Sequence, residues 1–204
     1  MKSPKYIAIT SGALLLNEFE QLLPILAGKD LERDLLKESK ENLLMKVKTE
    51  SARSRIITEI KRRNSFLPNG FWDFYQTASI DQRRILLFFI VLKSYLIAKD
   101  FQLEVVLGKW KRLETQFDLF DLQMRLDVLA SKSEEIDDWS ASTRLKVITV
   151  FIRCLREAGF LVNKKLRKLP EQSPAFWKYF IQIGEPWFLE ACLLSKPERD
   201  AILV

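Results

Sequence analysis

Apolar residues recur at helical spacing along most of this chain, so that they share one face of each predicted helix. In "KDLERDLLKESKENLL", Leu31, Leu35 and Leu36 fall on one side and the charges fall elsewhere. The stretch "ILLFFIVLKSYLIA", residues 85–98, is apolar nearly all round, which is typical of a buried central helix. The pattern predicts a mainly α protein.

Capping and helix-breaking residues place the ends of these helices. We expect Ser11 to cap the first helix, Pro24 to kink or divide it and Gly28 to end it. We expect Gly108 to interrupt the long helical pattern that follows the central apolar stretch. Residues 64–79, "NSFLPNGFWDFYQTAS", contain a proline and an Asn-Gly pair, so they are predicted to form a loop or boundary.

Two parts of the chain show the order of elements found in helix-turn-helix units. In the first, residues 29–44 are followed by a break at "MKVK" and a helix over 48–63. In the second, the helix 140–157 precedes "EAGFLVNKKLRKL", which predicts a glycine stop, an apolar strand and a basic hairpin. We expect a compact helical protein with two helix-turn-helix-like elements, the second winged by a short β-hairpin. The predicted regions are an N-terminal helix-turn-helix-like region (1–70), a central helical core with an acidic connector (71–138) and a C-terminal winged-helix-like region with an aromatic tail (139–204).

The charges of the chain are segregated into blocks. The 204 residues carry a net charge of +6. Residues 46–63 hold seven basic and two acidic side chains, and residues 144–168 hold eight basic and one acidic. Residues 114–138, by contrast, hold eight acidic and two basic side chains. Concentrated positive charge favours a polyanion as a partner.

The two basic helices resemble each other at an offset of 91 positions, which pairs Thr49 with Ser140. At about 100° per residue, each predicted helix has one apolar face that can pack inward and one face of hydroxyls and cations that is left to bind. The inward residues are Ile56, Ile57 and Ile60 in the first helix and Val147, Ile148, Phe151 and Leu155 in the second.

The outward faces have the chemistry of a nucleic-acid contact. Hydroxyls and free backbone N–H groups at a helix start bind phosphate oxygens, and the helix dipole adds positive potential there. Arginine and lysine further along a helix reach phosphates, or base edges in the major groove. We therefore expect double-stranded DNA to be bound by the two helices and by the wing, residues 160–168. The candidate residues are Lys48, Ser51, Arg53, Arg55, Thr58, Arg62, Ser142, Arg144, Lys146, Thr149, Arg153, Lys164, Lys165 and Arg167.

The composition gives little support to catalysis. The chain has no histidine, which is the commonest general base and metal ligand. It also has no phosphate-binding loop, no glycine-rich dinucleotide turn and no serine nucleophile elbow. The acidic run "SEEIDDW" would hold a cation only within a shaped loop. We expect no enzyme activity, no catalytic residue, no cofactor and no metal site.

Sequence features also indicate the compartment. Cys154 and Cys192 are too few for a disulfide scaffold or a zinc site, and we expect both to pack as small apolar side chains. No secretory signal is evident, and residues 85–98 are shorter than the roughly 20 apolar residues of a membrane span. A cytoplasmic protein without membrane contact is expected.

Three segments resemble the BrxA family of the bacterial BREX (bacteriophage exclusion) phage-resistance system. They are "YIAITSGALLLNEF", "ENLLMKVKTESARSRIITEIKRR" and "WSASTRLKVITVFIRCLREAGFL", and the resemblance spans residues 6–169. Its most distinctive parts are the Asn-Leu-Leu turn before the Ser/Arg helix and the Ser-x-Ser-Thr helix start. The resemblance implies a mostly helical protein that binds double-stranded DNA. It also implies a methyltransferase, an ATPase and a phosphatase-like protein as partners in the same system.

Three other interpretations remain open from the sequence. A cationic face is also typical of any solvated amphipathic helix. The protein would be an assembly adaptor if its acidic middle and aromatic tail dock other defence subunits without DNA contact. A compact helical module with basic faces also suits RNA.

Overall fold

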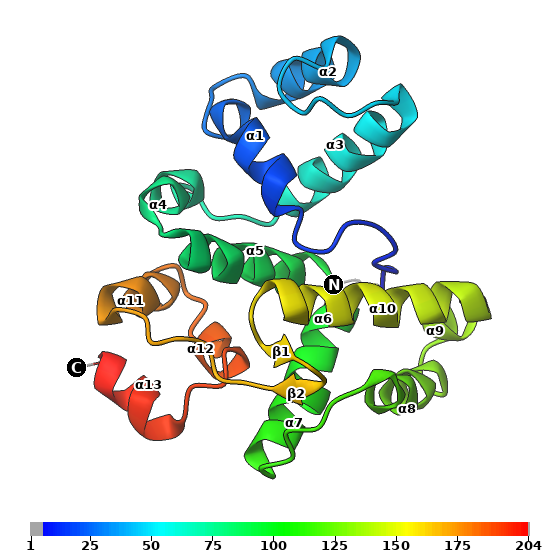
Figure 1. The fold of residues 1–204 in the computed structure, drawn as a ribbon, viewed down its shortest axis with the longest axis vertical. Helices are drawn as coiled ribbons and strands as arrows, with labels where there is room; N and C mark the ends of the chain where they lie inside the picture. The colour runs from blue at the N-terminus through cyan, green and yellow to red at the C-terminus, as the bar shows by residue number, and fades with distance from the viewer. Residues whose placement is uncertain (1–5, 204) are drawn as a thin grey trace.

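The computed structural model describes residues 6–203 as a mainly helical protein with one small antiparallel β-hairpin, which confirms the predicted fold class. Figure 1 shows the order of the elements. They are α1 (Leu16–Leu26), α2 (Leu31–Glu41), α3 (Glu50–Asn64), α4 (Phe71–Thr77), α5 (Ile80–Ser94), α6 (Leu96–Asp100), the π-helical η1 (Phe101–Val106), α7 (Leu107–Lys111), α8 (Leu119–Ala130), α9 (Glu134–Asp137), α10 (Ala141–Glu157), β1 (Leu161–Val162), β2 (Lys165–Leu166), α11 (Pro174–Gln182), α12 (Trp187–Ala191) and α13 (Lys196–Leu203).

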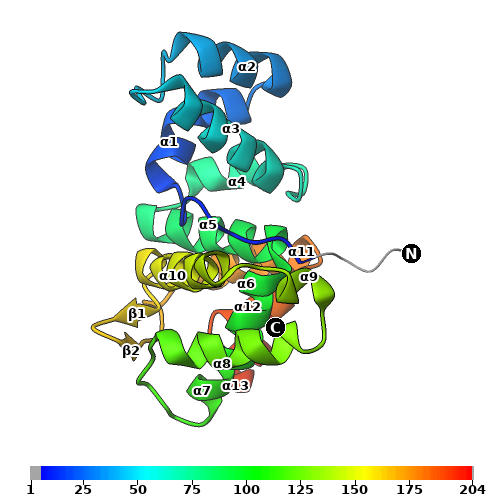
Figure 2. The same cartoon turned by 90° about the vertical axis from the view of Figure 1, so that its right-hand side faces the viewer.

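Helix α5 lies in the middle of the molecule, where it contacts α1, α3, α6 and α10. Figures 1 and 2 show α1, α2 and α3 together at one end and α7 and α8 at the other. The buried apolar side chains form one cluster that extends from Ile9 to Ile202. The two ends of the molecule therefore share a core.

The central apolar stretch is the buried helix that its pattern predicts. A capping box between Ser79 and Gln82 starts α5, and every residue from 85 to 92 is buried. The prediction that Gly108 interrupts the following helix is wrong, because Gly108 lies inside α7. The interruption falls instead at Tyr95, whose backbone is extended (φ −133°, ψ 108°). The Tyr95 side chain is buried there.

The first helix begins later than expected. Ser11 does not cap it, because residues 6–15 form a non-helical N-terminal segment and α1 begins at Leu16. The residue before the helix, Leu15, has a left-handed backbone (φ 59°). Pro24 lies within α1, and the helix ends just before Gly28, as the glycine predicts.

The predicted loop over residues 64–79 contains the short helix α4, so that prediction is wrong for its second half. Gly70, at φ 76°, starts this helix in the left-handed conformation that glycine adopts without strain. Phe71, Trp72 and Tyr75 are buried on α4, and Phe71 stacks on Phe89 of α5 with ring centroids 6.4 Å apart. Packing of these aromatic rings outweighs the local turn signals.

The side chain of Arg63 joins α3 to the N-terminal segment and is fully buried. Its Nε donates to Glu59 Oε1 at 2.7 Å, and its two terminal nitrogens donate to the carbonyl oxygens of Ala13 (2.7 Å) and Gly12 (3.0 Å). The Tyr95 hydroxyl donates to both oxygens of Glu59, at 2.6 and 2.7 Å. Burial, together with the Glu59 charge, raises the pKa of Tyr95. The network pairs one positive with one negative charge, and it joins α3, the N-terminal segment and the Tyr95 break that follows α5.

Both cysteines are fully buried, as expected for small apolar residues. Burial raises the pKa of the Cys154 thiol to about 12 and that of Cys192 well above its usual value. Native thiols are therefore protonated and shielded from reagents at neutral pH. In residues 6–203, none of the helices combines the length and the apolar character required to cross a bilayer.

We expect Arg63→Met to lower the free energy of unfolding by about 3–5 kcal/mol, because it leaves the Glu59 charge buried without its partner. Urea denaturation followed by circular dichroism measures this change. Arg62→Met is the matched control, since Arg62 is exposed on the same helix and its loss should cost within about 0.5 kcal/mol. Equal unfolding midpoints for the two variants would contradict the assigned role of Arg63.

Candidate nucleic-acid interface

The basic helix α3 starts with a hydroxyl cap and turns its apolar side inward. Thr49 Oγ1 accepts from the Ala52 N–H at 3.3 Å. Ile57 and Ile60 are buried, and Ile56 is half-buried. The predicted outward residues Ser51, Arg55, Thr58 and Arg62 are all exposed. The inward and outward faces thus lie where the sequence predicts.

Some outward groups of α3 bond to their own helix. Arg55 Nη2 donates to Ser51 Oγ at 3.1 Å, and the Thr58 hydroxyl donates to the Ser54 carbonyl oxygen at 2.8 Å. Neither Lys48 nor Arg62 forms an ion pair with the residues that the structure describes. Arg55, Thr58 and Arg62 line one hollow of about 320 Å³ beside the N-terminal segment. The cations of this face are therefore not neutralised by carboxylates.

Arg53 does not lie on this exposed face, although the sequence predicts it as a binding residue. It is 8% exposed. Its Nε donates to the Ser39 carbonyl oxygen at 2.9 Å and its Nη1 to the Val47 carbonyl oxygen, also at 2.9 Å. These bonds hold the end of α2 and the connection between α2 and α3 against α3. Arg53 has a structural role, because two carbonyl oxygens occupy its guanidinium.

The connection between α2 and α3 runs from Asn42 to Thr49. It is longer than the turn of about 3–4 residues in a helix-turn-helix. The Asn42 side chain bonds the Val47 backbone in both directions, at 3.0 and 3.1 Å. The buried Glu38 carboxylate accepts the N–H groups of Leu44 and Met45 at 2.8–3.1 Å. The turn is thus ordered, and its assignment to the helix-turn-helix class stays a prediction.

Helix α10 starts in the same way as α3. Ser140, the counterpart of Thr49, accepts from the Thr143 N–H at 3.2 Å. All four residues predicted to face inward are buried, namely Val147, Ile148, Phe151 and Leu155. The outward residues Ser142, Lys146, Thr149 and Arg153 are exposed. Thr149 donates to the Lys146 carbonyl oxygen at 3.0 Å, as Thr58 does to a carbonyl of α3.

Two arginines of α10 pair with carboxylates. Arg153 Nε lies 2.6 Å from Glu157 Oε1, although its side chain remains 68% exposed. Arg144 is 25% exposed and donates to Asp137 Oδ1 at 3.0 Å and to the Trp139 carbonyl oxygen at 3.1 Å. Arg144 was expected to face a ligand, and the structure places it against the protein's own acid. Its role in binding stays a prediction.

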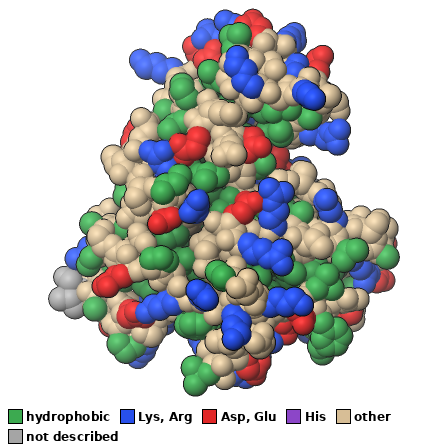
Figure 3. All heavy atoms as spheres, viewed as in Figure 1, with side chains coloured by type: hydrophobic (Ala, Val, Ile, Leu, Met, Phe, Trp, Pro, Cys, Tyr) green, Lys and Arg blue, Asp and Glu red, His purple; other side chains and the backbone are tan. Residues whose placement is uncertain are grey.

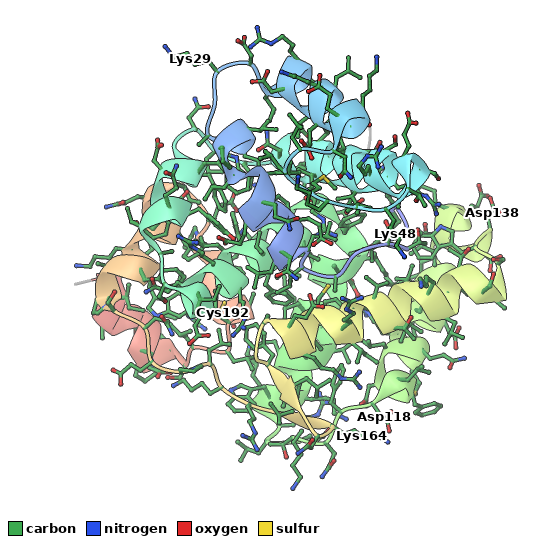
Figure 4. The ribbon with its side chains drawn as sticks, turned by 45° about the horizontal axis from the view of Figure 1, so that its top comes forward. Lys29, Lys48, Asp118, Asp138, Lys164 and Cys192 are labelled. Atoms are coloured by element: carbon green, nitrogen blue, oxygen red, sulfur yellow. The ribbon has the colours of Figure 1, made fainter. Side chains whose placement is uncertain are left out.

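The basic hairpin predicted after α10 is present. Gly159, at φ 91°, follows the end of the helix, and β1 pairs with β2 through Leu161 with Leu166 and Val162 with Lys165. The hairpin is anchored, because the Phe117 N–H donates to the Lys164 carbonyl oxygen at 2.8 Å. Lys164, Lys165 and Arg167 are exposed and form no ion pair with described residues. Figure 4 marks Lys48 at the start of α3 and Lys164 in the hairpin turn.

A larger hollow of about 930 Å³ connects these elements. Ile56 of α3, Arg153 and Arg156 of α10 and Arg167 after the hairpin all line it, with the N-terminal segment and the start of α5. Figure 3 shows the molecule notched between the part that contains α3 and the part that contains α10. Lysine and arginine side chains gather on this face over α10 and the hairpin. The concave surface is therefore shared by elements distant in sequence.

Sequence reasoning missed two arginines of this hollow, Arg84 and Arg156. Arg156 lies one helical turn after Arg153, and that spacing is a usable signal. Arg84 pairs with Asp81 at 3.0 Å at the start of α5, and only the tertiary fold brings it here. Lys168, also at the hollow, donates to Glu198 and holds the pKa of that carboxyl at about 2.

Comparison with known proteins gives three matches. The BrxA family model matches residues 5–173 of this chain. The "BREX protein BrxA" of Bacillus cereus (strain H3081.97) is 27% identical over 159 residues, which are 77% of this chain and 78% of that protein. A crystal structure of an uncharacterized protein from Magnetospirillum magneticum has a TM-score of 0.73 and 19% identity, and the match covers 93% of this chain and 98% of that one. At this identity the solved structure shows a common fold alone.

The turn of the hairpin holds a lysine in a backbone conformation that favours glycine. Asn163 and Lys164 both have left-handed backbones (φ 49° and 60°), the conformation of a two-residue type I′ turn, which favours glycine at its second position. We expect Lys164→Gly to raise the free energy of unfolding by up to about 1 kcal/mol. Lys165→Gly removes the same charge from a strand and should lower it by about 0.5–1 kcal/mol. Thermal denaturation of both variants tests this, and a loss of stability in Lys164→Gly would contradict the turn assignment.

Proposed function

Because the chain belongs to the BrxA family and thereby to the BREX phage-defence system, we propose that it is a non-catalytic, double-stranded DNA-binding subunit of that system. The proposed contacts run from α3, α10 and the β1–β2 hairpin mainly to DNA phosphates. Membership of the BREX system also implies other BREX subunits as partners. We propose that these are the methyltransferase, the ATPase and the phosphatase-like protein that the resemblance implies.

The distribution of unpaired cations carries this proposal. Among the described residues, most lysines and arginines outside residues 46–63 and 144–168 pair with an acid, as Arg83 does with Glu20 and Arg125 with Asp100. Most of the exposed cations that form no ion pair lie within those two stretches. Cations that have no acidic partner among the described residues are available to replace the counterions of a polyanion. Those within the two stretches are Lys46, Lys48, Arg55, Arg62, Lys146, Arg156, Lys164, Lys165 and Arg167.

Each element contributes a different kind of contact. Lys48, Arg55 and Arg62 follow the outer face of α3, and Lys146 occupies the corresponding face of α10. Hydroxyls on both faces, such as Ser51 and its counterpart on α10, suit phosphate oxygens, which also favour the positive ends of the helix dipoles. The hairpin cations would reach an adjacent stretch of backbone, as a wing does.

The hollow between α3, α10 and the hairpin would hold the phosphate backbone between these contacts. Arg156 and Arg167 line it without an acid partner among the described residues. Arg153 reaches the same hollow but shares its charge with Glu157, so its contribution is smaller. Arg53 and Arg144 are left out of the proposed interface, since protein oxygens already occupy their guanidinium groups.

Charge reversal on the two helices tests the proposal. In gel-shift titrations with a duplex across a range of salt, we expect Arg62→Glu with Lys146→Glu to weaken binding about tenfold or more. Binding releases about one counterion for each phosphate contact. The variant loses two contacts, so the slope of log affinity against log salt should become less steep by about 2.

The matched control is Lys132→Glu with Lys178→Glu. These two lysines are also exposed and without an ion pair among described residues, and they lie outside the proposed interface. The control changes the net charge equally, so it should retain affinity within about threefold, an effect of the general field alone. An equal loss of DNA affinity in the two double variants would show that only net charge matters, and it would contradict the assigned binding surface. In competition titrations, structured RNA that displaces the duplex at equal phosphate concentration would identify RNA, and not DNA, as the ligand.

A further inference from the structure

Helix α8 is apolar on two opposite faces. Leu122, Leu126 and Leu129 point into the core and are buried. Phe120, Met124 and Val128 follow one another four positions apart and are 64%, 56% and 44% exposed. At about 100° per residue, Met124 lies nearly opposite the buried leucines and the other two lie on either side of it. We call these three exposed residues the α8 ridge.

A ridge of this kind departs from the usual surface helix, which places polar residues opposite its core face. Single exposed apolar residues are common and need no explanation, whereas a continuous apolar row is typical of an interaction site. In Figure 3, apolar side chains gather over α8 at the lower right of the molecule. The ridge spans two helical turns, about 12 Å, which matches one face of a short partner helix.

Acidic groups border the ridge. Asp121 and Asp127 lie on its two sides, and the Asp127 side chain is 61% exposed. Asp118 precedes the helix and Asp138 follows α9 (Figure 4). Two nearby cations offset part of this charge, since Lys109 lies 2.6 Å from Asp121 and Arg144 lies 3.7 Å from Asp127. Residues 114–138 as a whole still hold eight acidic and two basic side chains.

We propose that the α8 ridge docks a cationic amphipathic helix of another protein. Such a helix offers apolar side chains to Phe120, Met124 and Val128 and lysines or arginines to the exposed Asp127 and the acids around it. The acidic border repels the phosphates of nucleic acids and of anionic membranes. It also disfavours a symmetric dimer, because a two-fold axis through the ridge would bring the acidic border of one copy beside that of the other.

The ridge begins beside the basic hairpin, since Phe117 bonds the Lys164 backbone just before α8. A helix docked on the ridge would therefore sit next to the proposed DNA contacts without covering α3. The docking itself does not depend on DNA binding. It gives the protein two surfaces of opposite character, one that suits a polyanion and one that suits a cationic protein.

The test uses the full-length protein and a labelled synthetic helix of about 18 residues, with leucines on one face and lysines on the rest. Fluorescence anisotropy without DNA should detect binding. Phe120→Gln with Met124→Gln and Val128→Thr keeps the net charge, and we expect it to weaken binding by about tenfold or more. A second peptide, with glutamate in place of every lysine, should bind at least about tenfold more weakly than the first.

Controls separate this proposal from DNA binding and from misfolding. All three substitutions are at exposed positions, and an unchanged thermal midpoint verifies the fold of the variant. Arg62→Glu, which lies on α3 and alters the proposed DNA surface, should bind the peptide like the wild type. Equal peptide affinity in the ridge variant and the wild type would overturn the proposal, as would equal affinity for the two peptides. Sedimentation that reveals a dimer abolished by the ridge variant would assign the ridge to a second copy and overturn it as well.

Discussion

The buried guanidinium of Arg63 is the constraint on which the placement of the two basic helices depends. A charge without solvent must be matched by charge and hydrogen bonds, and Arg63 meets this need with Glu59 and the carbonyls of Gly12 and Ala13. Those carbonyls belong to the N-terminal segment, whose next N–H, at Leu14, donates to Glu157 of α10 at 2.8 Å. A continuous set of hydrogen bonds therefore runs from α3 to α10. It holds the two helices on either side of the segment that lines their common hollow.

Arginines within the same basic stretches divide into structural and solvent-facing groups, and the sequence alone predicted only part of that division. The 100° helical spacing correctly placed Arg55 and Arg62 outward and Val147 inward. It could not show that Arg63 or Arg53 is buried, because the carbonyls that bind them lie in other segments, up to 51 residues away for Arg63. The sequence around a cation at the edge of an apolar face does not reveal that a carbonyl from a distant segment will bind it.

The same limit explains the errors in secondary structure. Gly159 and the Asn-Lys turn at 163 and 164 act through their own backbone conformations, so the helix stop and the hairpin were predictable. The break occurs instead at Tyr95, whose hydroxyl reaches Glu59 across the core, and α4 packs its aromatic rings against α5. Predictions from glycine, proline and turn residues were therefore correct where the local sequence determines the backbone conformation. They were wrong where contacts with distant segments determine it.

The charge of the molecule is sorted between surfaces, with free cations on α3, α10 and the hairpin and acids around α8. The central claim is that the three basic elements contact one duplex together. Photo-crosslinking from single cysteines tests it most directly, because the buried native Cys154 and Cys192 leave introduced thiols as the reactive sites. With labels at Ser54 on α3, Thr149 on α10 and Val162 on the hairpin, all exposed positions, we expect each to crosslink the same bound duplex, while a label at Met124 does not. A crosslink from only one of the three elements, or an equally strong one from Met124, would contradict the account.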